Sequence, residues 1–341
     1  MTALLEAQRV TKIFGGGLFD KTKTVALEAF SMAIESDPAT ITAVVGESGS
    51  GKTTLARLLF GAIAPTTGTI LYKGQDLQKL SKNETRAFLT DVQVIFQDPF
   101  EVYNPFYRVE HVLTMPIDYL KLANSNEQKW TMIEEALETV GLRPEETLGR
   151  YPHQLSGGQR QRVMVARAMI IKPSIILADE PVSMIDASLR ATVLGSLQRL
   201  KMEFGISIVY ITHDLATAFQ IGDNIIVMYR GSVAEVGGVE GVVQKPSHPY
   251  TQLLVGSMPN PNPDQPWKAE DKAAFPQKRP ESGACKFADR CPAAMHKCLL
   301  QAPPLYRTEE HRAVACFLYE DSPTIGSEEM DTVFKLNGRV H

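Results

Sequence analysis

A glycine-rich segment near residue 50 contains the residue types that hold phosphate groups. In chain order it reads Gly46, Glu47, Ser48, Gly49, Ser50, Gly51, Lys52 and Thr53, with Thr54 next. Glycines let successive backbone amides point at phosphate oxygens, the lysine reaches the β- and γ-phosphates, and the threonine hydroxyl can bind Mg²⁺. An apolar run at 40–45 precedes the segment and a helix-forming run at 54–60 follows it. The pattern predicts a nucleotide site between a strand and a helix; the alternative is a glycine-rich turn.

Two adjacent carboxylates follow another apolar run. Residues 175–178 are Ile, Ile, Leu and Ala, and Asp179 and Glu180 come next. The end of such a strand is expected at the sheet edge that carries the glycine-rich segment. Asp179 would then supply an oxygen ligand to Mg²⁺, and Glu180 would face an attacking water. The alternative is that both carboxylates only cap the strand.

A second anion-binding element is predicted at residues 155–159. It reads Leu155, Ser156, Gly157, Gly158 and Gln159, and a helix-forming run at 160–171 follows. A serine and two glycines that open a helix present free backbone amides, and the positive end of the helix dipole, to an anion. One chain therefore contains two elements for phosphate recognition.

These motifs, in this order, resemble the ATP-binding-cassette (ABC) ATPases, whose signature is the pentapeptide at 155–159. The resemblance implies ATP and Mg²⁺ as cofactors and hydrolysis of ATP as the reaction. It implies three catalytic residues: Glu180 at the water, Gln97 at Mg²⁺ and water, and His213 at the γ-phosphate. The implied Mg²⁺ ligands are Thr53, Gln97 and Asp179. A histidine after a strand is otherwise read as a polar cap.

Two further positions and a pairing follow from the same resemblance. Phe14 corresponds to the aromatic residue that stacks on adenine, although a core phenylalanine is an alternative. Asp186 corresponds to the D-loop aspartate, preceded by Met184 and Ile185 where the family usually has Ala and Leu. In this family the glycine-rich segment, here residues 46–53, is called the P-loop. Two cassettes pair head to tail, and each nucleotide lies between the P-loop of one and the Ser156-type signature of the other. A second ABC ATPase subunit is therefore expected; we favour a heterodimer, and a homodimer remains open.

Composition and apolar spacing predict the elements that position these residues. Hydrophobic residues make up 44% of the 341 residues and charged residues 22%, as in folded chains. Strand-sized apolar runs at 40–45, 92–96, 174–178, 206–211 and 224–228 alternate with helical stretches and predict an α/β fold with a mostly parallel sheet. Runs 4–14 and 25–34 alternate apolar with polar residues and predict an antiparallel β subdomain. Helical spacing predicts a helical insertion at about 98–170.

The chain is expected to divide into a nucleotide-binding domain, 1–256, and a C-terminal extension, 257–341. Prolines are dense between 259 and 280, which is typical of an extended linker. Residues 231–236 and 248–259 resemble the extension found in ABC importer ATPases of the dipeptide/oligopeptide (peptide/nickel) class. The resemblance implies uptake of oligopeptides, dipeptides or a related solute such as oligosaccharides. It also implies two transmembrane permease subunits and an extracellular solute-binding protein as partners.

Four cysteines fall in the C-terminal extension, which is expected to form a small Cys-rich domain. They are Cys285, Cys291, Cys298 and Cys316, with spacing C-x5-C-x6-C-x17-C. In a reducing compartment, four clustered thiols suggest a metal centre more than disulfides. Spacings wider than those of zinc sites favour a [4Fe-4S] cluster, and the resembled class is known to carry one; zinc and free thiols are the alternatives.

The expected location is the cytoplasmic face of the cell membrane, with attachment through the permease subunits. No apolar stretch approaches the ~18 residues of a membrane span. The net charge of -4 and the pI of about 6.0 argue against nucleic acid as a partner. A soluble ABC ATPase of nucleic-acid repair or translation, the alternative function, would be more basic and carry two cassettes.

Aromatic residues at Phe100, Tyr103 and Phe106 predict a docking groove for a permease helix. The alternative is that these aromatic residues only anchor the helical insertion to the core.

Overall fold

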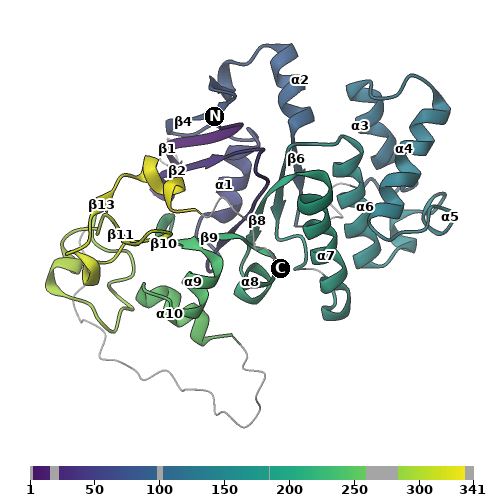
Figure 1. Ribbon diagram of the computed structural model, residues 1–341. Coiled ribbons are helices and arrows are strands. Elements are labelled where there is room, and N and C mark those ends of the chain that lie inside the picture. The colour runs from purple at the N-terminus through teal and green to yellow at the C-terminus, as the bar shows by residue number, and fades with distance from the viewer. Residues whose placement is uncertain (1–2, 16–22, 98–102, 184, 259–282, 335–341) are drawn as a thin grey trace, which may run out of the picture.

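The computed structural model describes residues 3–15, 23–97, 103–183, 185–258 and 283–334. These residues form two β-sheets with helices packed around them (Figure 1). The larger sheet has the strand order β13-β11-β12-β10-β9-β3-β8-β7-β6, and the smaller one β2-β1-β4-β5. The α/β architecture predicted from the sequence is confirmed.

The parallel part of the larger sheet carries the chemistry-bearing segments at its strand ends. Its strands are β3 (Ile41–Val45), β6 (Val92–Ile95), β7 (Ile175–Asp179), β8 (Ser207–Thr212) and β9 (Asn224–Tyr229). Each of the five apolar runs predicted as strands agrees with one of these to within one residue at either end. All residues of these strands are buried, because helices or the smaller sheet cover both faces.

Antiparallel strands continue the larger sheet beyond β9. They are β10 (Ser232–Gly238), β11 (Leu305–Glu309), β12 (Arg312–Val314) and β13 (Thr324–Ile325). Because β10 pairs with β12 across residues 235–237 and 312–314, the C-terminal segment is joined to the core by backbone hydrogen bonds (yellow in Figure 1).

The smaller sheet is antiparallel throughout. Its strands are β1 (Leu5–Gly15), β2 (Lys23–Ile34), β4 (Thr67–Tyr72) and β5 (Gln75–Asp76). Apolar side chains on its inner face, such as Leu5, Leu27 and Phe30, share a buried cluster with Leu55 and Leu58 of α1 (Lys52–Leu59). The smaller sheet therefore covers the helix that follows the glycine-rich segment.

Ten α-helices, α1 and nine more, lie between the strands or beside them in the described ranges. The nine are α2 (Lys82–Asp91), α3 (Glu110–Leu120), α4 (Asn126–Thr139), α5 (Pro144–Thr147), α6 (Gly157–Ile170), α7 (Ala187–Phe204), α8 (Leu215–Ile221), α9 (Val239–Gln244) and α10 (Pro249–Gly256). Helices α3 to α6 lie between β6 and β7 in the chain and gather on one side of the molecule in Figure 1. No helix in the described ranges combines the length and apolar character needed to cross a bilayer.

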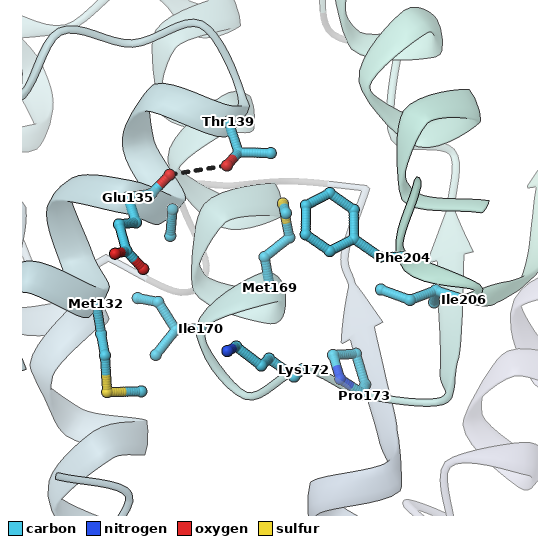
Figure 2. A pocket seen from close by; sticks show the side chains of 10 residues that line it. Met132, Glu135, Thr139, Met169, Ile170, Lys172, Pro173, Phe204 and Ile206 are labelled. Carbon is cyan, nitrogen blue, oxygen red and sulfur yellow. Dashed lines mark hydrogen bonds between the residues drawn. The ribbon is translucent and has the colours of Figure 1, made fainter. Parts of the chain in front are cut away.

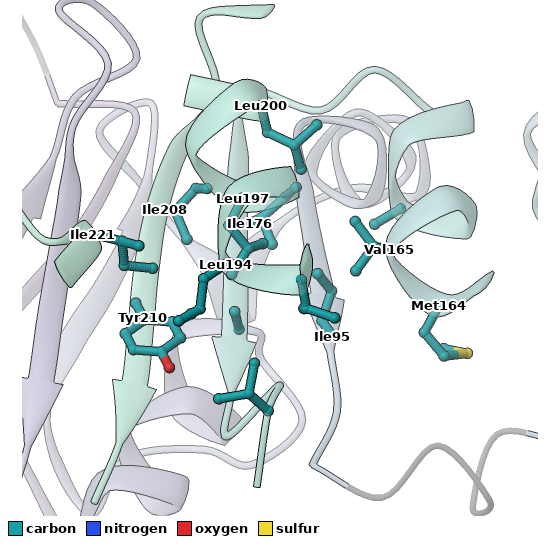
Figure 3. Close-up of a cluster of buried hydrophobic side chains, with 14 of the residues drawn as sticks. Ile95, Met164, Val165, Ile176, Leu194, Leu197, Leu200, Ile208, Tyr210 and Ile221 are labelled. Carbon is teal, nitrogen blue, oxygen red and sulfur yellow. The ribbon is translucent and has the colours of Figure 1, made fainter. Parts of the chain in front are cut away.

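Alternate residues of the parallel strands point into two separate cores. In β7, Ile176 and Ala178 belong to the cluster with α6 and α7, whereas Ile175 and Leu177 belong to the cluster with α1. Figure 3 shows part of the first cluster, where Leu194 and other residues of α7 pack on the sheet. Burial on both faces makes the parallel strands, and hence their ends, a rigid base for a site.

An apolar pocket opens where α4 and α6 meet the loops at the start of β7 and β8 (Figure 2). Its volume is about 210 Å³, and its lining includes Met132, Met169, Ile170, Phe204 and Ile206. None of the sequence-predicted site residues lines it. It is therefore distinct from the predicted nucleotide site.

Candidate functional site

Four segments meet at the carboxyl edge of adjacent parallel strands. β3, β8, β7 and β6 are neighbours in that order and run in the same direction. The glycine-rich segment follows β3, His213 follows β8, Glu180 follows β7 and Gln97 comes two residues after β6. This edge is where α/β sheets bind their ligands, because the loops after neighbouring strands converge there.

The glycine-rich segment curls around the amine of Lys52. Lys52 Nζ donates to the carbonyl oxygens of Gly46, at 2.7 Å, and Glu47, at 3.0 Å. Burial lowers the pKa of Lys52, while the nearby charges of Glu180 and Asp179 oppose that shift. Lys52 is therefore held at the carboxyl edge of the parallel strands, close to the carboxylates of Glu180 and Asp179.

Backbone geometry explains the glycines of this segment. Gly51 has φ of +102°, a left-handed conformation, and a Cβ there would lie 2.3 Å from the Ala26 carbonyl oxygen. A Cβ on Gly46 would lie 2.2 Å from the Met228 carbonyl oxygen. Ser50 is buried, whereas Ser48 and Gly49 are exposed at the tip of the loop. A larger residue at Gly46 or Gly51 would displace backbone and open the loop.

Asp179 and Thr53 together offer hard oxygen ligands. Burial raises the pKa of Asp179, and a side-chain hydrogen bond from the neighbouring Thr53 opposes that shift. Asp179 Oδ1 is buried and has no hydrogen-bond partner among the described residues. A buried carboxylate oxygen without a partner fits a cation ligand, because pairing with Mg²⁺ would offset its desolvation. The residue types and this orphaned oxygen therefore fit Mg²⁺.

The three residues expected to be catalytic are in direct contact. Gln97 Nε2 donates to Glu180 Oε2 at 3.0 Å, and His213 Nδ1 lies 3.0 Å from Glu180 Oε1. Glu180 itself has φ of +47°, and its N–H donates to the Ile211 carbonyl at 2.8 Å. A left-handed conformation costs a non-glycine residue free energy and is concentrated at functional sites. The surrounding strands hold Glu180 in this strained position between Gln97 and His213.

The pentapeptide at 155–159 forms the N-terminus of α6. Ser156 is the N-cap: its Oγ accepts from the Gln159 N–H at 3.2 Å, and Gln159 Oε1 accepts from the Ser156 N–H at 2.9 Å. Ser156 is exposed, Gly157 is half-buried, and Gly158 packs so closely that a Cβ would lie 2.7 Å from Leu189. In Figure 1, α6 lies well apart from α1. The structure thus does not bring the pentapeptide to the P-loop of its own chain.

Two more predicted residues lie near solvent. Phe14 is 43% exposed, with Lys12 Nζ 5.2 Å from its ring centroid, so it is not a core phenylalanine. Asp186 is exposed at the N-cap of α7, and its carbonyl accepts from the Leu189 and Arg190 amides. Both positions are accessible to a ligand or a partner subunit.

The aromatic segment after Gln97 divides into two kinds of residue. Tyr103 is buried, and its hydroxyl donates to the Arg160 carbonyl of α6 at 3.0 Å. Phe106 is 86% exposed. Phe100 lies outside the described residues. Tyr103 thus anchors this segment to α6, and Phe106 is available for docking.

The prediction of a [4Fe-4S] cluster on the four cysteines is wrong, and nothing supports zinc there. Cys285, Cys291, Cys298 and Cys316 do line one pocket, of about 10 Å³, but no group of His, Cys, Asp or Glu able to hold a metal ion occurs in the described part of the chain. Burial raises the pKa of Cys285 and Cys291, and that of Cys316 to about 11. Raised pKa values keep these three thiols protonated at neutral pH, as expected for cysteines packed among apolar side chains. They pack as small apolar side chains beside Phe287.

Sequence reasoning missed two residues at the P-loop. Tyr250 and Arg290 both contact Glu47, although they lie far from it in the chain. Neither has a local sequence signal, because a hydrogen bond or ion pair between distant segments leaves no periodic pattern.

The arrangement at the sheet edge is that of an ATP-binding cassette. Residues 28–183 match the family model of the ABC transporters, and residues 234–298 match that of the oligopeptide/dipeptide transporter C-terminal region. The ATP-binding cassette MJ0796, solved as a dimeric post-hydrolysis state bound to ADP and Pi, is 28% identical, with a TM-score of 0.61 over 69% of this chain and 98% of that chain. The fold is therefore that of an ABC ATPase.

Relatives extend over nearly the whole chain. A probable peptide ABC transporter ATP-binding protein, y4tS of Sinorhizobium fredii, is 39% identical over 92% of this chain and 89% of its own length. The di/tripeptide transport ATP-binding protein DppF of Pseudomonas aeruginosa is 37% identical over 93% of this chain and 98% of its own length. The chain belongs to the ATP-binding proteins of the oligopeptide/dipeptide ABC transporters, and its class of activity is ATP hydrolysis.

Proposed function

We propose that the chain hydrolyses ATP at the carboxyl edge of β3, β8, β7 and β6 and drives the import of peptides. The observation that carries the proposal is the contact of Glu180 with both Gln97 and His213 beside the P-loop lysine. In this role Glu180 polarises the attacking water. Gln97 and His213 orient its two carboxylate oxygens, and His213 also contacts the γ-phosphate.

Binding of the nucleotide falls to the P-loop and its neighbours. The backbone amides at the exposed tip of the loop receive phosphate oxygens, and Lys52 exchanges its bonds to the loop carbonyls for bonds to the β- and γ-phosphates. Thr53, Asp179 and Gln97 would hold Mg²⁺, which neutralises charge on the phosphates when bound. Phe14 stacks on adenine; its exposed ring supports that role.

A second cassette completes the site. Ser156 is exposed at the N-terminus of α6, next to Gly158 and Gln159 and apart from its own P-loop, which supports binding to a nucleotide held by a partner. Asp186, exposed at the start of α7, is available at the same interface. We favour a related ABC subunit as that partner, which gives a heterodimer.

The remaining partners are two permease subunits in the membrane and an extracellular solute-binding protein. The match of residues 234–298 to the oligopeptide/dipeptide C-terminal region, and the printed names of the relatives, support this assembly and peptides as its cargo. The chain then lies on the cytoplasmic face of the membrane.

Its nucleotide-binding domain is 1–256, with α3 to α6 acting as a helical insertion within about 98–170, and 257–341 is a small C-terminal domain. The exposed Phe106 supports docking of a permease helix at the insertion.

Peptide uptake by the source cells tests the proposal. Cells that lack this chain should lose uptake of labelled di- and oligopeptides. The wild-type chain should restore it, whereas Lys52→Ala should not. Uptake of a labelled oligosaccharide serves as the comparison for the related solutes. Restoration by Lys52→Ala would exclude ATP hydrolysis at this P-loop as the driving reaction, and unchanged peptide uptake without the chain would exclude peptides as cargo.

A further inference from the structure

An arginine of the C-terminal segment lies directly on the P-loop. Arg290 Nη1 donates to both carboxylate oxygens of Glu47, at 3.1 Å and 2.9 Å. The same nitrogen lies 3.4 Å from Tyr229 Oη, and the guanidinium carbon lies 5.7 Å from the ring centroid of Phe287. Hydrogen bonds and cation–π contacts together restrict this long side chain to one position.

The backbone of Glu47 is held from the same side. Its N–H donates to Tyr250 Oη at 2.9 Å. Tyr250 is fully buried, and its ring centroid lies 4.5 Å from Tyr229 and 5.5 Å from Phe287. This aromatic cluster joins the end of β9, the start of α10 and the segment that carries Arg290. Because the Glu47 amide is engaged by Tyr250, Glu47 serves as an anchor of the loop and not as a phosphate ligand.

The anchored peptide leads to the phosphate-binding lysine. The Glu47 carbonyl accepts from Lys52 Nζ at 3.0 Å and from the Ser50 N–H at 3.1 Å. We infer that Arg290 is a positioning residue for ATP: it binds the Glu47 carboxylate, fixes the Glu47 end of the P-loop in place, and neutralises a negative charge beside the triphosphate. This inference rests on the proposed function, since it requires ATP at this P-loop. It gives the C-terminal segment a direct role in the nucleotide site.

The effect is expected on ATP affinity more than on folding. The Arg290 and Glu47 side chains are 36% and 39% exposed, so water screens the pair and its contribution to overall stability is small. Without Arg290, the Glu47 carboxylate is unpaired, repels the triphosphate and is free to move. A screened interaction of this kind changes affinity by about three- to tenfold.

Titration of the purified full-length chain with a fluorescent ATP analogue and Mg²⁺, at low salt, tests the inference. Arg290→Ala should raise the Kd about three- to tenfold, and Arg290→Lys, which keeps the charge but not all contacts of the guanidinium group, should raise it less than Arg290→Ala does. In a Glu47→Gln background, Arg290→Ala should change the Kd by less than about twofold, because no carboxylate is released. Added salt should reduce the wild-type difference.

Lys286→Ala is the matched control. Lys286 Nζ pairs with Glu28 Oε2 at 2.7 Å and donates to the Arg230 carbonyl at 2.8 Å, so it also joins the C-terminal segment to the core but contacts no P-loop residue. This variant should bind ATP like wild type. Wild-type affinity in Arg290→Ala overturns the inference, as does an equal loss in the Glu47→Gln background or in Lys286→Ala. If instead the wild-type chain binds no ATP, or Lys52→Ala binds it equally well, the proposed function fails.

Discussion

Replacement of Glu180 by glutamine separates the chemistry of the site from its structure. Glutamine has the same shape as glutamate, and its side-chain oxygen can still accept a hydrogen bond from Gln97 Nε2. In the wild-type chain Gln97 Nε2 lies 3.0 Å from the Glu180 carboxylate. Its amide can donate to His213 Nδ1, which then acts as acceptor in the other tautomer. Both contacts survive, so we expect a stability change within about 0.5 kcal/mol and a Tm shift of no more than about 2 °C.

Turnover should respond very differently. Glutamine cannot polarise water as a carboxylate does, and loss of such a group typically costs 10²- to 10⁴-fold in rate, or about 2.7 to 5.4 kcal/mol of activation free energy. The assay is phosphate release by the assembled ATPase, with ATP binding and thermal melting measured on the same preparation. Glu203→Gln, an exposed change at the end of α7, is the control and should leave all three unchanged. A Glu180→Gln protein that hydrolyses ATP at the wild-type rate would refute the assignment.

Three other substitutions test separate parts of the site. Lys52→Ala should weaken ATP binding at least tenfold in a nucleotide titration, because it removes the buried amine that reaches the phosphates; unchanged affinity would contradict the P-loop assignment. Ser156→Arg should abolish phosphate release but preserve ATP binding at its own P-loop, at a cost of about 1 kcal/mol in melting from the lost helix cap; a fully active monomer at high dilution would contradict the shared site. Phe106→Asp should uncouple peptide uptake from ATP hydrolysis in the reconstituted importer, since the side chain is exposed; loss of both activities with a lowered Tm would indicate a structural role instead.

The parallel strands and the P-loop could be predicted from the sequence because their signals are local. A buried parallel strand is a short continuous apolar run, and each of the five such runs is a strand of the sheet. The order of glycines, lysine and threonine at 46–53 likewise indicates the backbone conformation of the loop, since Gly51 adopts a left-handed conformation that favours glycine. The cysteine spacing contained no such constraint. It predicted a metal centre, whereas the folded chain packs the four residues around one small pocket and forms no group able to hold a metal ion in its described part.

The sequence motifs were enough to predict the type of nucleotide site and the residues proposed to form it, one motif at a time. Which of these residues touch depends on how the whole chain folds. Gln97 and Glu180 are 83 residues apart in the chain, and Arg290 and Glu47 are 243 apart, yet each pair is in hydrogen-bond contact. The physical reason is that strand order and the docking of the C-terminal segment depend on burial summed over the whole sheet. A contact that results from that packing leaves no pattern in the residues on either side of it.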